Sequence, residues 1–149
     1  MSSSKIISVN ISSEKGVRKT PVDQGELSPE VGLVGDAHAG PWHRMLSLLS
    51  VESIQTMRDK GLEVNPGDFA ENITTEGLTL YTLPIGARMK LGSVEVEVTQ
   101  IGKECHAGCA IRQQTGDCVM PREGIFVRVL SQGVVKPGDP VELLDASEA

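Results

Sequence analysis

Aromatic side chains are scarce in this chain, which contains one tryptophan, one tyrosine and two phenylalanines. Proteins that bind single-stranded nucleic acid stack its bases on aromatic rings. The formal net charge of −6 at pH 7 also opposes binding to a phosphate backbone. We therefore expect no nucleic-acid partner.

A long apolar run is also missing, and the chain has only three cysteines. No window approaches the roughly 20 apolar residues that a membrane span needs. The first five residues, Met1–Lys5, have neither the basic nor the apolar region of a signal peptide. An odd cysteine count without an export signal favours the reduced cytoplasm, where thiols are free, metal-bound or reactive. We expect a cytoplasmic protein with no membrane partner.

The pattern of short apolar stretches predicts a mainly β protein, and the length favours one domain, residues 1–149. Lys5–Ile11 reads as a strand, and Val94, Val96 and Val98 alternate with polar residues in another. The Gly92-Ser93 pair suits a hairpin turn before that second strand. Many short strands separated by glycine and proline turns favour a single twisted, barrel-like sheet over alternating βαβ units. Three such turns are expected, at Pro66-Gly67-Asp68, Pro84-Ile85-Gly86 and Pro137-Gly138-Asp139.

One main short helix is predicted at Val51–Lys60. Ser50 is a good N-cap, and Glu52 complements the helix dipole. Apolar residues share one face of this stretch, and Gly61 can end it. The helix should pack on the sheet.

The segment Lys103–Phe126 contains all the thiols of the chain, at Cys105, Cys109 and Cys118. Lys103 and His106 lie next to Cys105, and positive neighbours lower a thiol pKa and raise its thiolate fraction. Cys105 is therefore the preferred reactive thiol. Two alternatives stay open: metal ligation together with His106, Cys109 and Cys118, or plain packing of one or more thiols as small buried groups.

Two further segments carry candidate binding residues. Asp36, His38, His43 and Arg44 fall in a glycine-bounded stretch that reads as a loop, and loops carry function more often than strands do. Two interpretations stay open: these side chains bind a ligand, or they only hold the loop in place by hydrogen bonds. The pair Glu71-Asn72 follows a turn and can bind a hydroxyl or amide, or can stabilise the turn itself.

The longest motifs resemble the MOSC domain, the C-terminal module of molybdenum cofactor sulfurases that also occurs as a stand-alone bacterial protein. The matching phrases cover nearly the whole chain: Gly35-Asp36-Ala37-His38-Ala39-Gly40 with His43-Arg44, Gly67-Asp68-Phe69-Ala70-Glu71-Asn72-Ile73, Leu83-Pro84-Ile85-Gly86, Gly102-Lys103-Glu104-Cys105-His106, and Met120-Pro121-Arg122-Glu123-Gly124-Ile125-Phe126.

This resemblance implies a protein that holds activated sulfur as a cysteine persulfide, or that ligates the molybdenum cofactor (molybdopterin) through a cysteine. The cysteine maps to Cys105, which would then also be the metal ligand. The larger relatives have a closer cysteine pair than the Cys-x3-Cys spacing here, so Cys109 stays a rival and Cys118 a third candidate. The implied cofactor-binding residues are Asp36, His38, His43, Arg44, Glu71, Asn72, Lys103, His106 and Arg122, with Arg128 as a further cation for the phosphate.

The resemblance also implies partners. The chain shows no segment like the pyridoxal-phosphate desulfurase domain of the larger relatives, so a cysteine desulfurase or another sulfur donor would supply the sulfur. A molybdenum-cofactor enzyme or another metal–sulfur centre would accept it. Enzymatic activity, as a sulfurtransferase or through the cofactor, is left open.

Two other functions remain compatible with the residues. A small zinc-binding structural or interaction module would use the Cys/His cluster, and a reductase component would use the molybdenum cofactor in catalysis. If one ligand is bound, His38, Arg44, Asn72 and Cys105 should surround a shared cleft.

Overall fold

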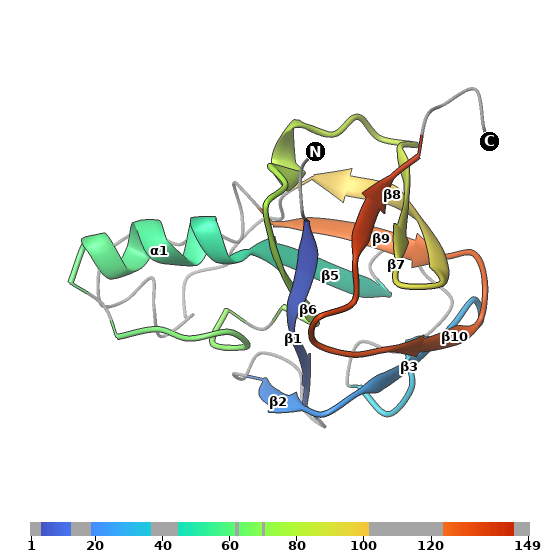
Figure 1. Cartoon of the computed structure of the whole chain (residues 1–149), viewed down its shortest axis with the longest axis horizontal. Coiled ribbons are helices and arrows are strands. Elements are labelled where there is room, and N and C mark those ends of the chain that lie inside the picture. Colours follow the sequence, from blue (N-terminus) through green and yellow to red (C-terminus); the bar gives the residue numbers. More distant parts are fainter. Residues whose placement is uncertain are drawn as a thin grey trace.

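The computed structural model describes residues 4–12, 19–36, 45–61, 63–69, 71–101 and 124–144 (Figure 1). Within them the fold is mostly β, with one α-helix and one short 3-10 turn, as the sequence pattern predicts. The elements in chain order are β1 (Lys5–Ile11), β2 (Thr20–Val22), β3 (Gly25–Ser28), β4 (Gly32–Leu33), β5 (Leu46–Ser50), α1 (Val51–Asp59), β6 (Ile73–Glu76), η1 (Leu80–Thr82), β7 (Arg88–Leu91), β8 (Val94–Ile101), β9 (Ile125–Val129), β10 (Gly133–Val135) and β11 (Val141–Leu143).

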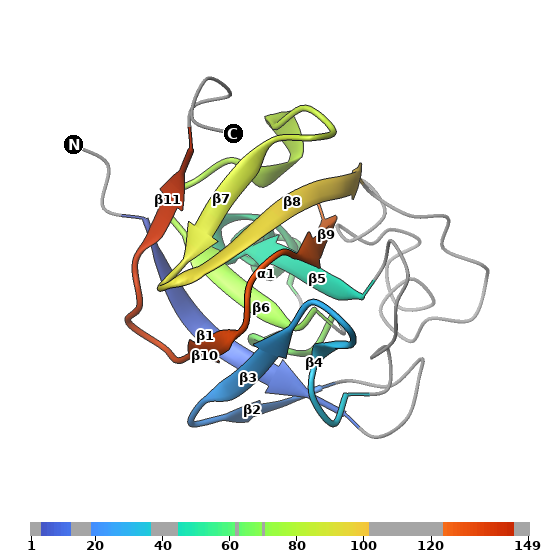
Figure 2. The same cartoon turned by 90° about the vertical axis from the view of Figure 1, so that its right-hand side faces the viewer.

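Eight of these strands form one curled sheet in the order β11-β7-β8-β9-β5-β6-β1-β2. A smaller sheet, β10-β3-β4, lies beside β1 and β2 in the lower part of Figure 2. The first and last parts of the chain meet where the large sheet curls round. The Ile6 amide donates to the Asp139 carbonyl at 2.8 Å, and the Val141 amide donates to the Ser4 carbonyl at 3.0 Å. These bonds bring the β11 end of the sheet against β1, so the strands enclose a barrel-like core.

Local signals in the sequence correctly predict the helix and the hairpin. The Ser50 hydroxyl accepts from the Ser53 amide at the start of α1, and Gly61 has φ +95 just beyond its end. Strands β7 and β8 pair antiparallel around Gly92, which has φ +62. The three predicted Pro/Gly turns are also turns, since Gly67, Gly86 and Gly138 each have a positive φ.

One connection departs from the antiparallel pairing of the rest of the sheet. Strands β5 and β6 are parallel, with Leu48 opposite Ile73, and α1 lies between them in the chain. A parallel pair needs a crossover connection, and the helix supplies it. The rest of the pairing in the described strands is antiparallel.

Two apolar clusters stabilise this arrangement. The larger fills the inside of the curled sheet and includes Val94, Val96 and Val98 of β8, whose alternation with half-buried residues was evident in the sequence. The smaller cluster joins the apolar face of α1 to the sheet through Phe126 of β9. Helix α1 therefore covers one part of the outer sheet surface and leaves the rest of β8 and β9 open.

The turn at Gly67 depends on the absence of a side chain. Gly67 has φ +92, and a Cβ built there would stand 2.3 Å from the Lys19 carbonyl oxygen. Gly138 has almost the same φ, +94, but nothing lies within 4 Å of its would-be Cβ. The same substitution at these two glycines therefore distinguishes the cost of backbone strain from the cost of a steric clash.

We predict that Gly67→Ala lowers the free energy of unfolding by about 3 kcal/mol or more, because strain and a backbone clash add. Gly138→Ala should cost only about 1–2 kcal/mol, the strain alone. Urea denaturation of both variants measures the difference. Equal losses would show that the contact with Lys19 does not constrain the turn.

Candidate functional site

Arg128, the further cation, lies in the described part of the chain, and so do three of the nine candidate binding residues: Asp36, Glu71 and Asn72. All three are buried, with exposed fractions of 6%, 0% and 1%. The candidate residues outside the described ranges are Cys105, Cys109, Cys118, His38, His43, Arg44, Lys103, His106 and Arg122. The expected shared cleft around His38, Arg44, Asn72 and Cys105 therefore stays a prediction.

Asn72 links β5 to β1 just before β6 begins. Its side-chain oxygen accepts from the Ser47 amide at 3.0 Å and from the Ser47 hydroxyl at 3.2 Å. Its backbone carbonyl accepts from the Asn10 amide at 2.7 Å. The side-chain nitrogen donates to the Asn10 carbonyl at 3.4 Å. One asparagine thus connects the start of β5 to the end of β1.

Glu71 is the end of a buried chain of hydrogen bonds. The Ser8 hydroxyl donates to the Asn10 side chain at 2.6 Å, and Asn10 donates to the Thr74 hydroxyl at 3.1 Å. Thr74 in turn donates to Glu71 Oε2 at 2.7 Å, which also accepts from the Gly67 amide at 3.0 Å. Within the described residues, the other carboxyl oxygen, Oε1, has no hydrogen-bond partner. Glu71 therefore anchors the turn at Gly67 to β6.

Burial raises the pKa of Glu71 from 4.5 to about 7. Removal from water disfavours the carboxylate, and this outweighs the lowering of the pKa by backbone amides of the turn and by the Thr74 hydroxyl. Near neutral pH the group is thus poised between the neutral acid and the anion. A buried anion there weakens the fold, since its desolvation is only partly offset.

A buried ion pair lies beside this turn. Lys19 Nζ is 2.8 Å from Asp36 Oδ1, and both side chains are at most 1% exposed. The same Asp36 oxygen accepts from the Ser12 amide at 3.1 Å. The Lys19 amide donates to the Gly67 carbonyl at 2.8 Å, so the pair and the turn are joined. Sequence reasoning missed Lys19, because lysine is normally exposed and no motif marks this one.

These contacts place two of the sequence motifs in one polar core. Asp36 belongs to the first motif, and Gly67, Glu71 and Asn72 belong to the second. Their described contacts are with other groups of the protein. Asp36 directly precedes residues 37–44, so the ion pair fixes the point from which that candidate segment leaves the sheet.

The cysteine segment leaves from a neighbouring part of the sheet. Residues 102–123 connect β8 to β9, and the two strands end opposite one another, with Ile101 paired with Ile125. Strand β9 also pairs with β5, which follows residues 37–44. Strands β8, β9 and β5 are thus adjacent in the sheet (Figure 2). Residues 37–44 precede Leu46, which pairs with Val127, whereas residues 102–123 precede Ile125, which pairs with Leu48. The two candidate segments therefore join the sheet at opposite ends of the β5–β9 pair.

No group of three or more histidine, cysteine, aspartate or glutamate side chains is arranged to hold a metal ion within the described ranges. The four residues of the zinc hypothesis, Cys105, His106, Cys109 and Cys118, fall outside those ranges, so that hypothesis stays untested. Neither α1 nor any other helix in the described residues has the length and apolar character to cross a membrane.

Comparison with known proteins identifies the family. The model of the MOSC domain matches residues 35–142. Among solved structures, the YUAD protein from Bacillus subtilis has the same fold, with a TM-score of 0.78, 20% identity and 95% of each chain covered. YiiM from Geobacillus stearothermophilus is 25% identical with a TM-score of 0.73, over 95% of this chain and 75% of that one. YiiM from Escherichia coli is 26% identical with a TM-score of 0.62, over 94% and 70%. No curated protein matches the sequence significantly.

The raised pKa of Glu71 predicts a pH-dependent stability. Between the unfolded value of 4.5 and the folded value of about 7, the folded state keeps a proton that the unfolded state has lost. Stability therefore falls as pH rises through this window, and the contribution of this group should amount to roughly 2–3 kcal/mol between pH 5 and 8. Glu71→Gln cannot ionise and should remove this part of the pH dependence, as measured by urea denaturation at several pH values.

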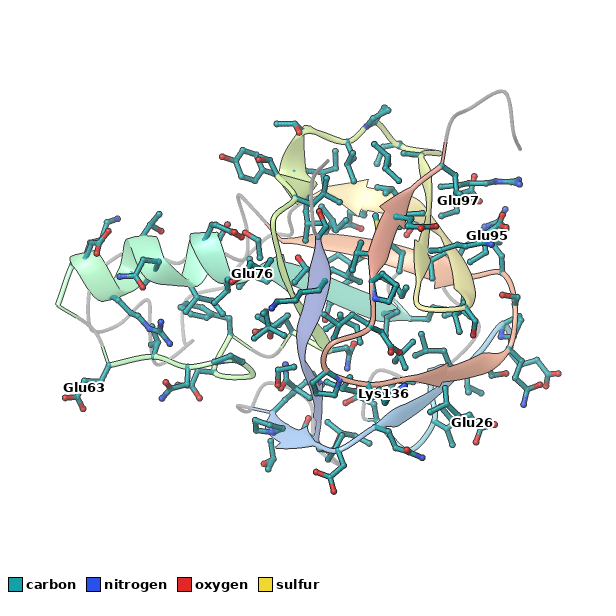
Figure 3. All side chains as sticks on the ribbon, viewed as in Figure 1. Glu26, Glu63, Glu76, Glu95, Glu97 and Lys136 are labelled. Atoms are coloured by element: carbon teal, nitrogen blue, oxygen red, sulfur yellow. The ribbon has the colours of Figure 1, made fainter. Side chains whose placement is uncertain are left out.

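Glu63→Gln is the matched control. Glu63 is exposed and points away from the molecule (Figure 3), so its substitution should leave the wild-type pH dependence unchanged. If Glu71→Gln keeps the full wild-type slope between pH 5 and 8, the carboxyl of Glu71 does not carry the proton.

Proposed function

Because this chain belongs to the MOSC domain family, we propose that it holds activated sulfur as a persulfide on Cys105 and passes it to an acceptor. The observation that carries the proposal is the position of the thiols. Every cysteine of the chain lies in the single connection between β8 and β9. A connection positioned by a rigid sheet is a common place for reactive groups.

The two candidate segments join adjacent strands, at opposite ends of the β5–β9 pair, since Leu46 pairs with Val127 and Leu48 with Ile125. Residues 37–44, with His38, His43 and Arg44, enter the sheet at β5. The thiol segment flanks β9, the strand next to β5. In this proposal the histidines and cations of both segments surround the thiol, and Lys103 and His106 keep it in the thiolate form.

The loading step is a thiol–persulfide exchange. The Cys105 thiolate attacks the terminal sulfur of a persulfide on a donor such as a cysteine desulfurase. A new S–S bond forms at Cys105, the donor S–S bond breaks, and the donor cysteine leaves with the electron pair as a thiolate. The exchange is fastest when the pKa of the attacking thiol is close to ambient pH, and it needs the reduced thiols of the cytoplasm.

Release to a metal centre requires a further reactant. The terminal sulfur leaves as sulfide only when it receives two electrons, and a second thiol can supply them while forming a disulfide with Cys105. The acceptor in this proposal is a metal–sulfur centre such as that of a molybdenum-cofactor enzyme.

The buried polar core has a positioning role in this proposal. Asp36 accepts from the Ser12 amide and Asn72 from the Ser47 amide, so these bonds hold Asp36 and the start of β5, between which residues 37–44 run. Direct contact with a ligand is assigned to the candidate residues of those segments: His38, His43, Arg44, Lys103, His106 and Arg122.

The donor set also suits the molybdenum cofactor. A cysteine thiolate is a soft ligand that suits the metal, and Arg44, Lys103 and Arg122 offer cations for the phosphate of molybdopterin. Cys105 would be the metal ligand. Bound there, the cofactor would supply redox chemistry at the metal, which is the basis of the alternative reductase function.

Cys105→Ser should reduce sulfur loading at least about tenfold, because a serine hydroxyl is not ionised at neutral pH and cannot replace the thiolate. The test incubates the protein with a cysteine desulfurase and isotopically labelled cysteine, then maps the added sulfur by peptide mass spectrometry. Cys109→Ser and Cys118→Ser are the matched controls and should load like the wild type.

Sulfur found mainly on Cys109 or Cys118 would move the carrier role to that residue. Absence of sulfur on all three thiols, together with one tightly bound zinc per chain, would contradict the carrier function and favour the zinc module.

A further inference from the structure

A groove of about 730 Å³ crosses the part of β8 and β9 that α1 leaves open. Its volume falls within the range of small-molecule sites. Strands β8 and β9 form its floor, and the turn Pro84–Gly86 forms one wall. The lining residues are Pro29, Met45, Ile85, Gly86, Glu97, Val98, Thr99, Arg128, Val129 and Leu130.

The apolar wall of the groove is held in place by the backbone. The Gly86 amide donates to the Val98 carbonyl at 2.8 Å, and the Val98 amide donates to the Ala87 carbonyl at 2.8 Å. These bonds extend the pairing of β7 and β8 into the turn. Ile85, on that turn, is 59% exposed. An aliphatic side chain is thus presented to solvent on a fixed support.

The polar part of the groove is a single ion pair. Glu97 and Arg128 lie opposite one another in the register of β8 and β9, and Arg128 Nε donates to Glu97 Oε1 at 2.5 Å. In the described part of the chain no other hydrogen bond to either side chain is formed. Terminal N–H groups of Arg128 and Oε2 of Glu97 therefore remain as adjacent donor and acceptor.

Gly86 keeps this acceptor accessible. A Cβ built at Gly86 would stand 4.0 Å from Glu97 Oε2, and Gly86 has φ +94, which other residues rarely adopt. The turn thus passes the carboxylate without covering it. The opening beside Oε2 follows from the backbone and does not require a side chain to move.

We propose that this groove binds a small uncharged molecule through a carboxamide group or an equivalent edge of a heterocycle. The ligand carbonyl accepts from Arg128, its N–H donates to Glu97, and its apolar body lies against Ile85 and Leu130. Charge selects this class: an anion loses at Glu97 what it gains at Arg128, and a cation the reverse, whereas a neutral amide forms a hydrogen bond with both groups at no such cost. No cysteine takes part, so the site does not rest on the proposed sulfur chemistry, and it gives Arg128 a role other than the phosphate cation that the family resemblance implies.

Three ligands of nearly the same shape test the proposal: benzamide, benzoate and benzamidine, which are neutral, negative and positive at pH 7. Each is titrated into the ¹⁵N-labelled full chain and followed by NMR. Benzamide should shift the amide signals of Gly86, Val129 and Leu130, and bind roughly fivefold or more tightly than the two charged ligands. Equal binding of the three, or no shift at these amides, would overturn the proposal.

Single-charge variants should reverse the preference. Glu97→Gln leaves the Arg128 charge alone and should make benzoate the tightest of the three ligands. Arg128→Gln leaves Glu97 and should favour benzamidine. A second ion pair, Arg88–Glu95 at 3.5 Å, does not line the groove and provides the controls. The Arg88→Gln and Glu95→Gln variants should still bind benzamide more tightly than benzoate or benzamidine.

A variant of the wall tests the apolar contact separately. Ile85→Ala should weaken all three ligands alike, by roughly threefold or more, without changing their order. Leu143→Ala removes a similarly exposed aliphatic side chain outside the groove and should change nothing. An unchanged ligand order in both charge variants, in proteins whose spectra show an intact fold, would rule out recognition by the ion pair.

Discussion

The arrangement of the described strands depends on a buried asparagine at the junction of three of them. Asn72 bonds to Ser47 at the start of β5 and to Asn10 at the end of β1, and β6 begins at the next residue. Its side chain and backbone continue the hydrogen-bond ladder where the strands themselves do not meet. Loss of one of these bonds would leave buried backbone groups without partners, which costs more than the bond itself gains.

The polar core around Asn72 also explains the length of the motif that precedes it. Gly67 provides the close approach to Lys19, Glu71 binds the Gly67 amide, and Asn72 joins the strands. Gly67 and Glu71 are bonded to each other, and Asn72 directly follows Glu71. The group therefore works as a unit, and it fixes the start of β5, which follows residues 37–44.

Elements with local signals could be predicted from the sequence. The cap at Ser50, the glycine at residue 61 and the valine alternation of β8 act within a few residues, and all appear in the structure. Strand β5 gives no alternation because all five of its residues are buried. Strand β6 reads as polar, although Thr74 and Thr75 are fully buried. Their parallel pairing depends on contacts that no local pattern encodes.

The candidate site was predictable in part, for a related reason. Polar residues in unusual loop contexts were recognised, among them Asp36, Glu71 and Asn72, but whether a side chain faces a ligand or the protein depends on its surroundings in space. Lys19 shows the limit. Its side chain is 1% exposed and bonded to Asp36, yet nothing near it in the sequence distinguishes it from a surface lysine.

The contact between the two ends of the sheet has a consequence for synthesis of the protein on the ribosome. Strand β1 is synthesised long before residues 138–141, which bond to it. Until they emerge, Ile6 has no partner for its amide on that side, and the apolar inside of the sheet is open along one edge. The nascent chain must therefore keep an incomplete sheet from pairing with other chains until residues 138–141 have been made.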